Sequence, residues 1–287
     1  MRVLITILIL ILCSSSQGQI VINASAPYRP SLNLLLDQYG SAVAAYSLRK
    51  LNTSYSGFCI RVRRDSTGQS ESDIGFDSNG LLDTVSLKNF IRNNSGYVVT
   101  WYDQSGSSNN ATQSTASNQP RIVSSGVIDR QSNIPTLVFA DNTDFFNIST
   151  TNTSHVVSVA KINTLNAINY IVANTGNSGY YYGGTAGGIN GIGVFFGSTL
   201  VSLTGEDTNR HLAWYSFRGS RVYAAKDGGS ETNLAAAGYA LTVNVISHNT
   251  TVRSFIGNIQ EIIAWNSDIS SNKSGIESNI NMFYAIY

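Results

Sequence analysis

Charged side chains are scarce in this sequence. Lys and Arg contribute 18 residues and Asp and Glu contribute 17, so charged residues are 12% of the 287 and the formal net charge is +1. Nucleic acids, anionic membranes and acidic proteins attract partners with an excess of positive charge. We therefore expect neither a nucleic-acid partner nor a membrane surface. Asn, Ser, Thr and Gly must supply the polar surface instead, a composition typical of secreted β-proteins.

Cysteine and histidine are also scarce. Of the two cysteines, Cys13 lies in an apolar leader, which leaves Cys59 without an intramolecular disulfide partner. Its neighbours Phe58 and Ile60 indicate a buried thiol that packs as a small hydrophobe. The three histidines, at positions 155, 211 and 248, have no ligand spacing for zinc, and no run of Asp has the spacing of a calcium loop. The sequence predicts no metal and no cofactor.

Long apolar runs are missing except at the start of the chain. Arg2 precedes an apolar run over residues 3–12 and small or polar residues over 14–18, the pattern of a secretory signal peptide. We expect residues 1–18 to be this signal, with cleavage before Gln19 and a secreted or cell-surface product. A lipoprotein anchored at Cys13 is the alternative, although Leu12 is bulky where that processing requires a small residue. No other apolar segment is long enough to span a bilayer.

The rest of the chain predicts one domain. Residues 19–30 read as an exposed lead-in, and residues 31–287 as a single sandwich of a size that β-proteins commonly reach in one unit. Alternation of apolar and polar residues, or β-branched and aromatic runs, predict strands; these fall at 58–64, 73–76, 97–102, 120–123, 136–139, 155–162, 167–173, 210–217, 220–226, 240–247 and 254–265. Helices are expected at 31–39, at 84–92 after an Asp83 N-cap, and at 271–287. The fold class is therefore all-β, with short peripheral helices and a C-terminal helix.

Two stretches are candidates for ligand contact. Residues 96–110, GYVVTWYDQSGSSNN, read as a strand that ends in a polar turn. Trp101 would stack on a sugar face, and Asp103, Gln104 and Asn109 would bond its hydroxyls. A well-capped turn without a ligand explains the same residue types.

The second stretch, residues 176–193, is rich in glycine around a tyrosine triplet. Tyr180, Tyr181 and Tyr182 predict either a stacking platform for a sugar ring or a hairpin whose tyrosines fill a sheet face.

Several segments resemble the catalytic domain of the α-L-arabinofuranosidase B family. The segments are AAYSLRKL at 44–51, SYSG at 54–57, IRVRR at 60–64, DIG at 73–75, WYDQSG at 101–106 and Asn109. The resemblance implies a concanavalin A-like jelly-roll sandwich. The C-terminal half is similar, more loosely, to laminin G-like lectin domains through HLAW at 211–214, VY at 222–223, DG at 227–228 and FIG at 255–257 with Glu261.

The catalytic residues of that family do not carry over. The resemblance implies a retaining hydrolase, which needs a carboxylate nucleophile and a carboxylic acid. The family's nucleophile follows a Gly-Asn pair, and Gly179 stands at the matching position after Gly176 and Asn177. The acid's nearest position is His248, with no carboxylate over residues 243–252. Glu206 and Asp207 are the alternative catalytic pair.

Three classes of function follow. The leading hypothesis is a secreted, lectin-like sandwich domain that binds a glycan without glycosidase activity, and retention on polysaccharides would test it. The alternative is an α-L-arabinofuranosidase-like hydrolase, which a carboxylate pair in a groove would favour. The second alternative is a structural adhesion or fibre module, which a symmetric assembly would favour. The fold alone does not choose among them.

Overall fold

The computed structural model describes residues 34–163, 165, 169–176, 178–182, 191–196, 199–205, 207–236, 241–247 and 253–287. The expected signal peptide and lead-in lie outside these residues. The helices are α1 (Leu35–Gln38), α2 (Thr84–Ile91) and α3 (Lys273–Tyr284), with one-turn 3₁₀ helices η1 (Ala116–Asn118) and η3 (Ser270–Asn272). No helix in the described ranges is long and apolar enough to cross a membrane.

Strands make up most of the remaining structure. In the first half they are β1 (Ala42–Ser47), β2 (Ile60–Arg64), β3 (Glu71–Ile74), β4 (Gly96–Trp101), β5 (Ala111–Thr112), β6 (Arg121–Ser124), β7 (Val127–Ile128), β8 (Arg130–Gln131), β9 (Ile134–Pro135), β10 (Leu137–Phe139) and β11 (Phe145–Thr153). In the second half they are β12 (His155–Ile162), β13 (Asn169–Ala173), β14 (Ser178–Tyr182), β15 (Gly191–Phe196), β16 (Thr199–Thr204), β17 (Arg210–Arg218), β18 (Arg221–Lys226), β19 (Thr232–Ala236), β20 (Leu241–Ser247) and β21 (Gly257–Trp265).

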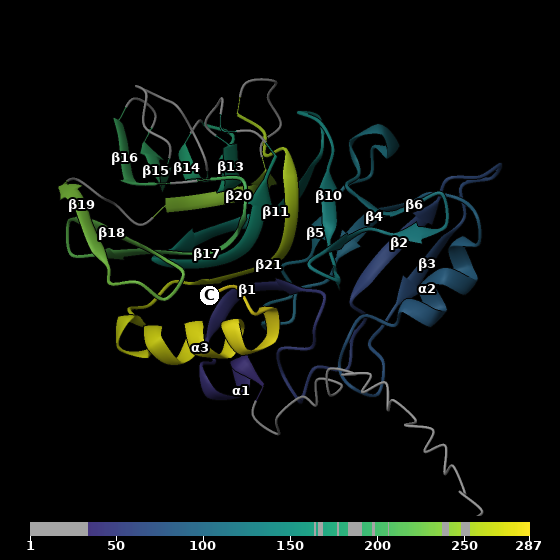
Figure 1. The fold of residues 1–287 in the computed structure, drawn as a ribbon, viewed down its shortest axis with the longest axis horizontal. Helices are drawn as coiled ribbons and strands as arrows, with labels where there is room; N and C mark the ends of the chain where they lie inside the picture. Colours follow the sequence, from purple (N-terminus) through teal and green to yellow (C-terminus); the bar gives the residue numbers. More distant parts are fainter. Residues whose placement is uncertain are drawn as a thin grey trace, which may run out of the picture.

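The strands form two facing layers. One layer runs β19-β18-β17-β12-β21-β1, and the other runs β16-β15-β14-β13-β20-β11. Strands β4, β5, β6 and β10 join the layers at one end, where β2, β3 and α2 also lie (Figure 1). These pairings are all antiparallel. The expected all-β jelly-roll sandwich is confirmed.

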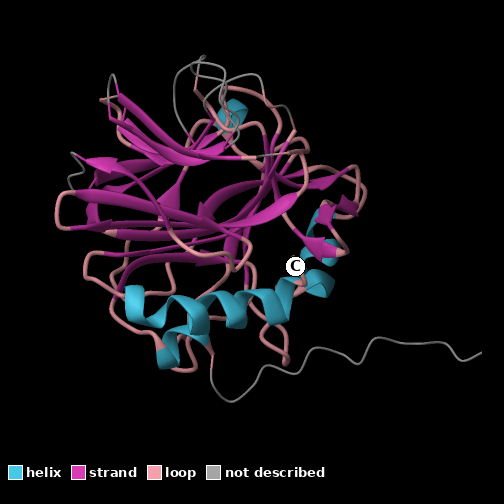
Figure 2. Ribbon diagram, turned by 60° about the vertical axis from the view of Figure 1, so that its left-hand side comes forward, coloured by secondary structure: helices cyan, strands magenta, loops and turns pink. Residues whose placement is uncertain are grey.

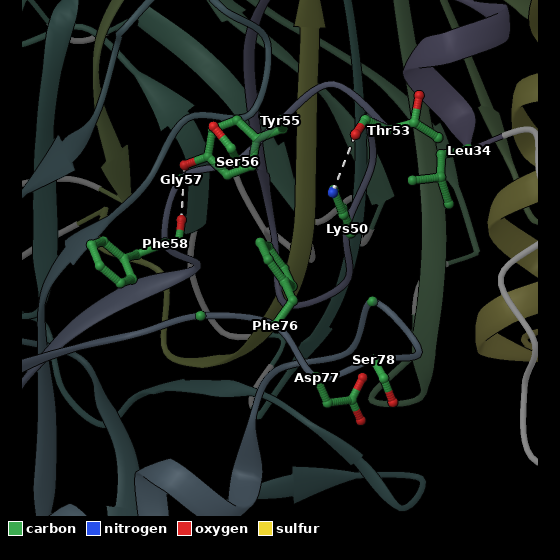
Figure 3. Close-up of a pocket in the computed structure, with 12 residues that line it drawn as sticks. Leu34, Lys50, Thr53, Tyr55, Ser56, Gly57, Phe58, Phe76, Asp77 and Ser78 are labelled. Atoms are coloured by element: carbon green, nitrogen blue, oxygen red, sulfur yellow. Dashed lines mark hydrogen bonds between the residues drawn. The ribbon is translucent and has the colours of Figure 1, made fainter.

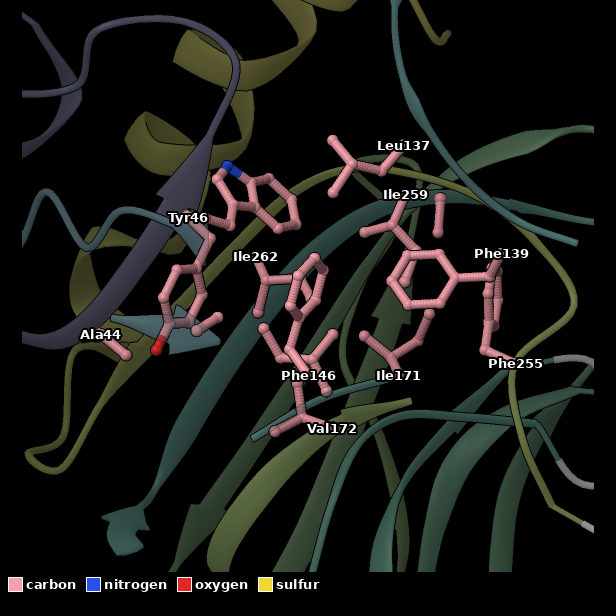
Figure 4. Packing of buried hydrophobic residues seen from close by; sticks show 14 of the residues in the cluster. Ala44, Tyr46, Leu137, Phe139, Phe146, Ile171, Val172, Phe255, Ile259 and Ile262 are labelled. Atoms are coloured by element: carbon pink, nitrogen blue, oxygen red, sulfur yellow. The ribbon is translucent and has the colours of Figure 1, made fainter. Parts of the chain in front are cut away.

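The main hydrophobic core fills the space between the layers. Figure 4 shows side chains from both layers and from the connecting strands packed together, with Phe139 edge-on to Phe146 and to Phe255. Each fully buried side chain of this size contributes about 1.5–3 kcal/mol to the stability of the fold. The core therefore holds the two layers in a fixed relation.

A second core lies on the outer face of one layer. Helix α3 runs along that face with α1 beneath it (Figure 2). Because β21 is buried on both faces, successive residues divide between the cores: Ile262 packs in the first, and Ile263 and Trp265 in the second. This explains why residues 254–265 are apolar without alternation.

Most expected elements are found within one to four residues of their predicted ends. The Asp83 cap is confirmed, since its Oδ1 accepts hydrogen bonds from the Val85 N–H (3.1 Å) and the Ser86 N–H (2.9 Å). One side-chain orientation is wrong. Phe58 was expected to open an inward-facing strand, but β2 begins at Ile60 and Phe58 is 49% exposed.

Candidate functional site

A groove of about 530 Å³ opens where two loops, residues 50–58 and 75–80, face each other. Figure 3 shows three aromatic rings and several polar side chains along it. The lining residues are Leu34, Lys50, Thr53, Tyr55, Ser56, Gly57, Phe58, Gly75, Phe76, Asp77, Ser78 and Gly80. Three of the segments that carry the family resemblance, 44–51, 54–57 and 73–75, thus end at or lie in this groove.

Three aromatic side chains give the groove its apolar surface. The ring of Tyr55 lies edge-on to that of Phe76, with centroids 6.3 Å apart, while Phe58 is 49% exposed and packs beside Tyr102 at 6.2 Å. The Tyr55 hydroxyl donates a hydrogen bond to the Phe58 carbonyl (2.8 Å). A Cβ at Gly57 would lie 2.5 Å from that hydroxyl oxygen, so glycine is what lets the ring lie across the loop.

The Tyr55 hydroxyl stays protonated over the physiological range. Burial, with smaller contributions from Cys59 and Asp103, raises the pKa of Tyr55 to about 12. The ring therefore presents a neutral, flat surface, the type of surface on which the apolar face of a sugar packs.

The polar side of the groove is a rigid turn at residues 77–81. Asp77 Oδ1 accepts hydrogen bonds from the Asn79 and Leu81 N–H groups, both at 2.9 Å. The Lys50 N–H donates to the Gly80 carbonyl (2.7 Å), which ties this turn to the opposite loop. Asp77 is exposed and lies beside Ser78, below Phe76 in Figure 3.

Carboxylates are scarce in the groove. Among its lining residues, all of which the structure describes, Asp77 is the one carboxylate. In most families of glycoside hydrolases, both the retaining and the inverting mechanism use two carboxyl groups that flank the scissile bond. Aromatic planes beside a few polar groups are instead the usual composition of a small-ligand site.

The structure places the sequence-predicted residues of the 96–110 stretch elsewhere. Trp101 and Gln104 are 0% exposed, and Asp103 and Asn109 are each 4% exposed. None of these side chains faces the surface as a sugar contact would require. Trp101 is the last residue of β4, and the other three belong to the loop that follows it.

Their contacts are structural. Asp103 accepts hydrogen bonds from the Ala45 N–H (2.8 Å) and the Asn109 N–H (3.0 Å), and Gln104 Oε1 accepts one from the Leu51 N–H (2.8 Å). The Gln104 side-chain amide also donates to the Arg49 carbonyl (3.0 Å). The WYDQSG segment therefore anchors the chain at residues 45–51, from which the groove loop departs.

The tyrosine triplet is also buried. Tyr180, Tyr181 and Tyr182 are each 0% exposed on β14. The Tyr180 hydroxyl lies 2.6 Å from Thr153 Oγ1, and that of Tyr182 donates to the Ala160 carbonyl (3.2 Å). A stacking platform needs an exposed ring face, so the structure favours the alternative prediction, tyrosines that fill a sheet face.

Of the alternative catalytic pair, Glu206 lies outside the described residues, as does His248. Asp207 is half exposed and its Oδ1 lies 2.9 Å from His211 Nε2, while His211 Nδ1 lies 2.5 Å from Asp227 Oδ2. Burial raises the pKa of Asp207, but hydrogen bonds from Asn209 and from the His211 ring outweigh it and bring the value down to about 2. Asp207 is therefore ionised, as a nucleophile or base is and a general acid is not.

A pocket of about 560 Å³ adjoins this Asp-His-Asp cluster, lined by His211, Asp227, Lys161, Arg210 and neighbours. Within the described part of the chain, no group of three or more His, Cys, Asp or Glu side chains is arranged to hold a metal ion.

The groove itself was not predicted from the sequence. The SYSG segment was the available signal, since it carried the family resemblance without a role of its own.

A nearly closed antiparallel sandwich is the architecture of jelly-roll domains, among them lectin domains. The family model described as α-L-arabinofuranosidase B, catalytic, matches residues 37–180, which is half of the chain. The chain belongs to this family. No curated protein matches it.

Solved structures agree on the fold. The chain is similar to a mutant GH54 α-L-arabinofuranosidase soaked with 4-nitrophenyl α-L-arabinofuranoside, with a TM-score of 0.65 and 16% identity. It is similar to an arabinofuranosidase complexed with arabinofuranosyl-α-1,2-xylobiose, with a TM-score of 0.64 and 16% identity. Both comparisons cover 83% of this chain and 62% of the other, so the chain spans less than two thirds of those proteins.

Proposed function

We propose that this chain is a secreted glycan-binding domain that holds arabinofuranosyl groups in the groove lined by Tyr55, Phe58 and Phe76 and does not cleave them. The observation that carries the proposal is the composition of the groove: three aromatic rings, several hydroxyls and one carboxylate. Family membership supports the class of ligand, since related structures contain arabinofuranosyl compounds.

Packing and hydrogen bonding would both contribute to binding of the sugar. A sugar ring that covers Phe58 and Phe76 removes apolar surface from water, at about 25 cal/mol per Å². Asp77 and the hydroxyls of Ser56 and Ser78 then fix the orientation of the ring. Because the groove is open and one-sided, we expect modest affinity, with Kd in the micromolar to millimolar range.

Calorimetric titration with arabinofuranosyl-α-1,2-xylobiose tests this proposal. Loss of one stacking ring in Phe58→Ala should weaken binding by about three- to tenfold. The matched control is Tyr287→Ala, since Tyr287 is similarly exposed (53%) and lies outside the groove. Absence of binding by the unmodified chain, or equal loss in both variants, would refute the site.

Arabinofuranosidase activity is the second candidate function. It is favoured by the family match and by Asp207, an exposed and ionised carboxylate that follows Glu206 in the sequence. If the chain is a hydrolase, it should release nitrophenol from 4-nitrophenyl α-L-arabinofuranoside, and Glu206→Gln and Asp207→Asn should each reduce the rate at least 100-fold.

Asp268→Asn is the control for this assay, because Asp268 is also an exposed aspartate with a pKa lowered by hydrogen bonds, first of all from the Ser270 backbone. It should leave the rate unchanged. A rate no higher than that of a protein-free blank would remove the hydrolase candidate and leave the binding function in place.

A further inference from the structure

A second cavity of about 250 Å³ lies directly beside the groove. Asp77 lines both spaces, so the turn at residues 77–81 is the wall between them. The cavity is lined by Leu48, Asp77, Leu81, Leu82, Thr84, Arg130, Asn133, Ile134, Pro135 and Phe283.

The cavity differs from the groove in chemistry. Leu81, Ile134, Pro135 and Phe283 are half-buried and face it, and Leu48 and Leu82 are buried behind them. Four lining residues, Asp77, Thr84, Arg130 and Asn133, are polar, but hydroxyls of a bare sugar that pack against the six apolar ones would lack partners, which is unfavourable. An apolar group does not have this disadvantage, because it loses no hydrogen bonds on entering.

The walls are held in place by backbone contacts. Isolated β-bridges join Phe76 to Leu82 across the base of the dividing turn and Leu81, the last residue of the turn, to Arg49. On the far wall, β8 pairs with β9, and Arg130 Nη1 donates a hydrogen bond to the Asn133 carbonyl (2.7 Å) across that hairpin. The cavity is therefore a built feature of the fold, with its shape set before any ligand arrives.

We propose that this cavity receives an aromatic or similar apolar substituent carried by the sugar that the groove binds. The inference rests on the proposed function, and it specifies the ligand class: aryl- or acyl-substituted glycosides in preference to unsubstituted ones. An apolar protein cavity of about 150 Å³ is large enough for benzene, so 250 Å³ accommodates a substituted phenyl ring. The Arg130 guanidinium at the rim is placed to contact the ring or its polar substituent.

The test compares two glycosides on the unmodified chain by calorimetry. The probes are methyl α-L-arabinofuranoside and 4-nitrophenyl 1-thio-α-L-arabinofuranoside, whose sulfur linkage resists hydrolysis. We expect the aryl compound to bind at least about tenfold more tightly, from the apolar area that a phenyl ring buries. We also expect 4-nitrophenol to compete with the aryl compound and not with the methyl compound.

Point variants test whether the tighter binding of the aryl compound comes from the cavity. Ile134→Ser should weaken binding of the aryl compound by about three- to tenfold and leave binding of the methyl compound unchanged. Val127→Ser is the control, since Val127 is 69% exposed and lines neither space. The wild-type comparison does not depend on how well a variant folds.

The outcomes separate the two proposals. Equal affinity for both glycosides overturns this inference and leaves the groove as a sugar site. No binding of either glycoside, together with no binding of 4-nitrophenol, overturns both. Binding of the aryl compound that is equally weakened by Val127→Ser also overturns the inference.

Discussion

The carboxyl group of Asp144 is buried, and burial is unfavourable for its charged form. It is 6% exposed, and its Oδ2 accepts a hydrogen bond from the Ala140 N–H (2.6 Å). Burial is the main reason that the pKa of Asp144 is raised to about 6, and the nearby Asp141 carboxylate adds to the effect. At neutral pH the folded protein therefore keeps a poorly solvated negative charge at this position.

The pH dependence of stability follows from this shift. Between the ordinary aspartate pKa of about 3.9 and the raised value, the folded state binds more protons than the unfolded state, so stability falls as pH rises through this window. Asp144→Asn keeps the acceptor for Ala140 and removes the charge. It should be more stable than the wild type above pH 6, by on the order of 2 kcal/mol, with no difference of this kind near pH 4.

Urea unfolding at closely spaced pH values measures the difference between the two proteins. A constant difference from pH 4 to pH 8 would contradict the assignment, because a titrating carboxyl group must change it.

At the scale of elements, one buried ion pair fastens helix α3 to the sheet. Arg49, just after β1, pairs with Glu261 of β21 through Nε (2.8 Å) and Nη2 (3.0 Å), and both side chains are at most 2% exposed. Arg49 Nη1 donates to Asn279 Oδ1 (2.9 Å), and its guanidinium carbon lies 4.9 Å from the centre of the Phe283 ring. Two strands and the helix thus share one charged centre.

Removing half of this pair should be costly. Glu261→Gln leaves the Arg49 charge buried without its counter-ion, and we expect a loss of about 3 kcal/mol in the free energy of unfolding. The control is Asp73→Asn in the pair Arg61–Asp73, whose side chains are 42% and 21% exposed. Solvent screens that pair, so its loss should be about 1 kcal/mol or less. Equal losses in the two variants, measured by urea unfolding, would show that burial does not govern the energetics here.

At the scale of the whole molecule, local patterns predicted the elements that depend on local chemistry. The Asp83 cap and the apolar run of β12 appear in the sequence as they do in the structure. Strand β11 was not predicted because its sequence, FFNISTTNT, is mostly polar. Pairing with β20 and the burial of Phe146 and Ile148 stabilise it, and neither is visible in the local pattern.

The groove was not predicted for the same reason as β11, because it is formed by contacts between residues far apart in the sequence. Tyr55, Phe58 and Phe76 belong to two loops that long-range contacts hold together. Pairing of Ile60 with Ile74 places residue 58 beside residues 75–76, and the bridges at Leu81 and Leu82 bring residues 76–82 back beside residues 48–49. Alternation assigned Phe58 to the interior, and residue types alone assigned ligand contact to Asp103 and Gln104. The residue types were interpreted correctly: Phe58 is an aromatic contact, and Asp103 and Gln104 form a turn. Whether each side chain faces water or the interior depends on long-range contacts that the local sequence does not contain.

The position of β21 also has a consequence for how the protein is made. This strand pairs with β1 near the start of the chain and with β12 in the middle. The ribosome must therefore synthesise every residue from β1 to β21, including β12, before the sheet that contains β1 can be completed. Until then β1 and β12 each expose an unpaired edge, and the nascent chain needs protection from association with its neighbours during synthesis.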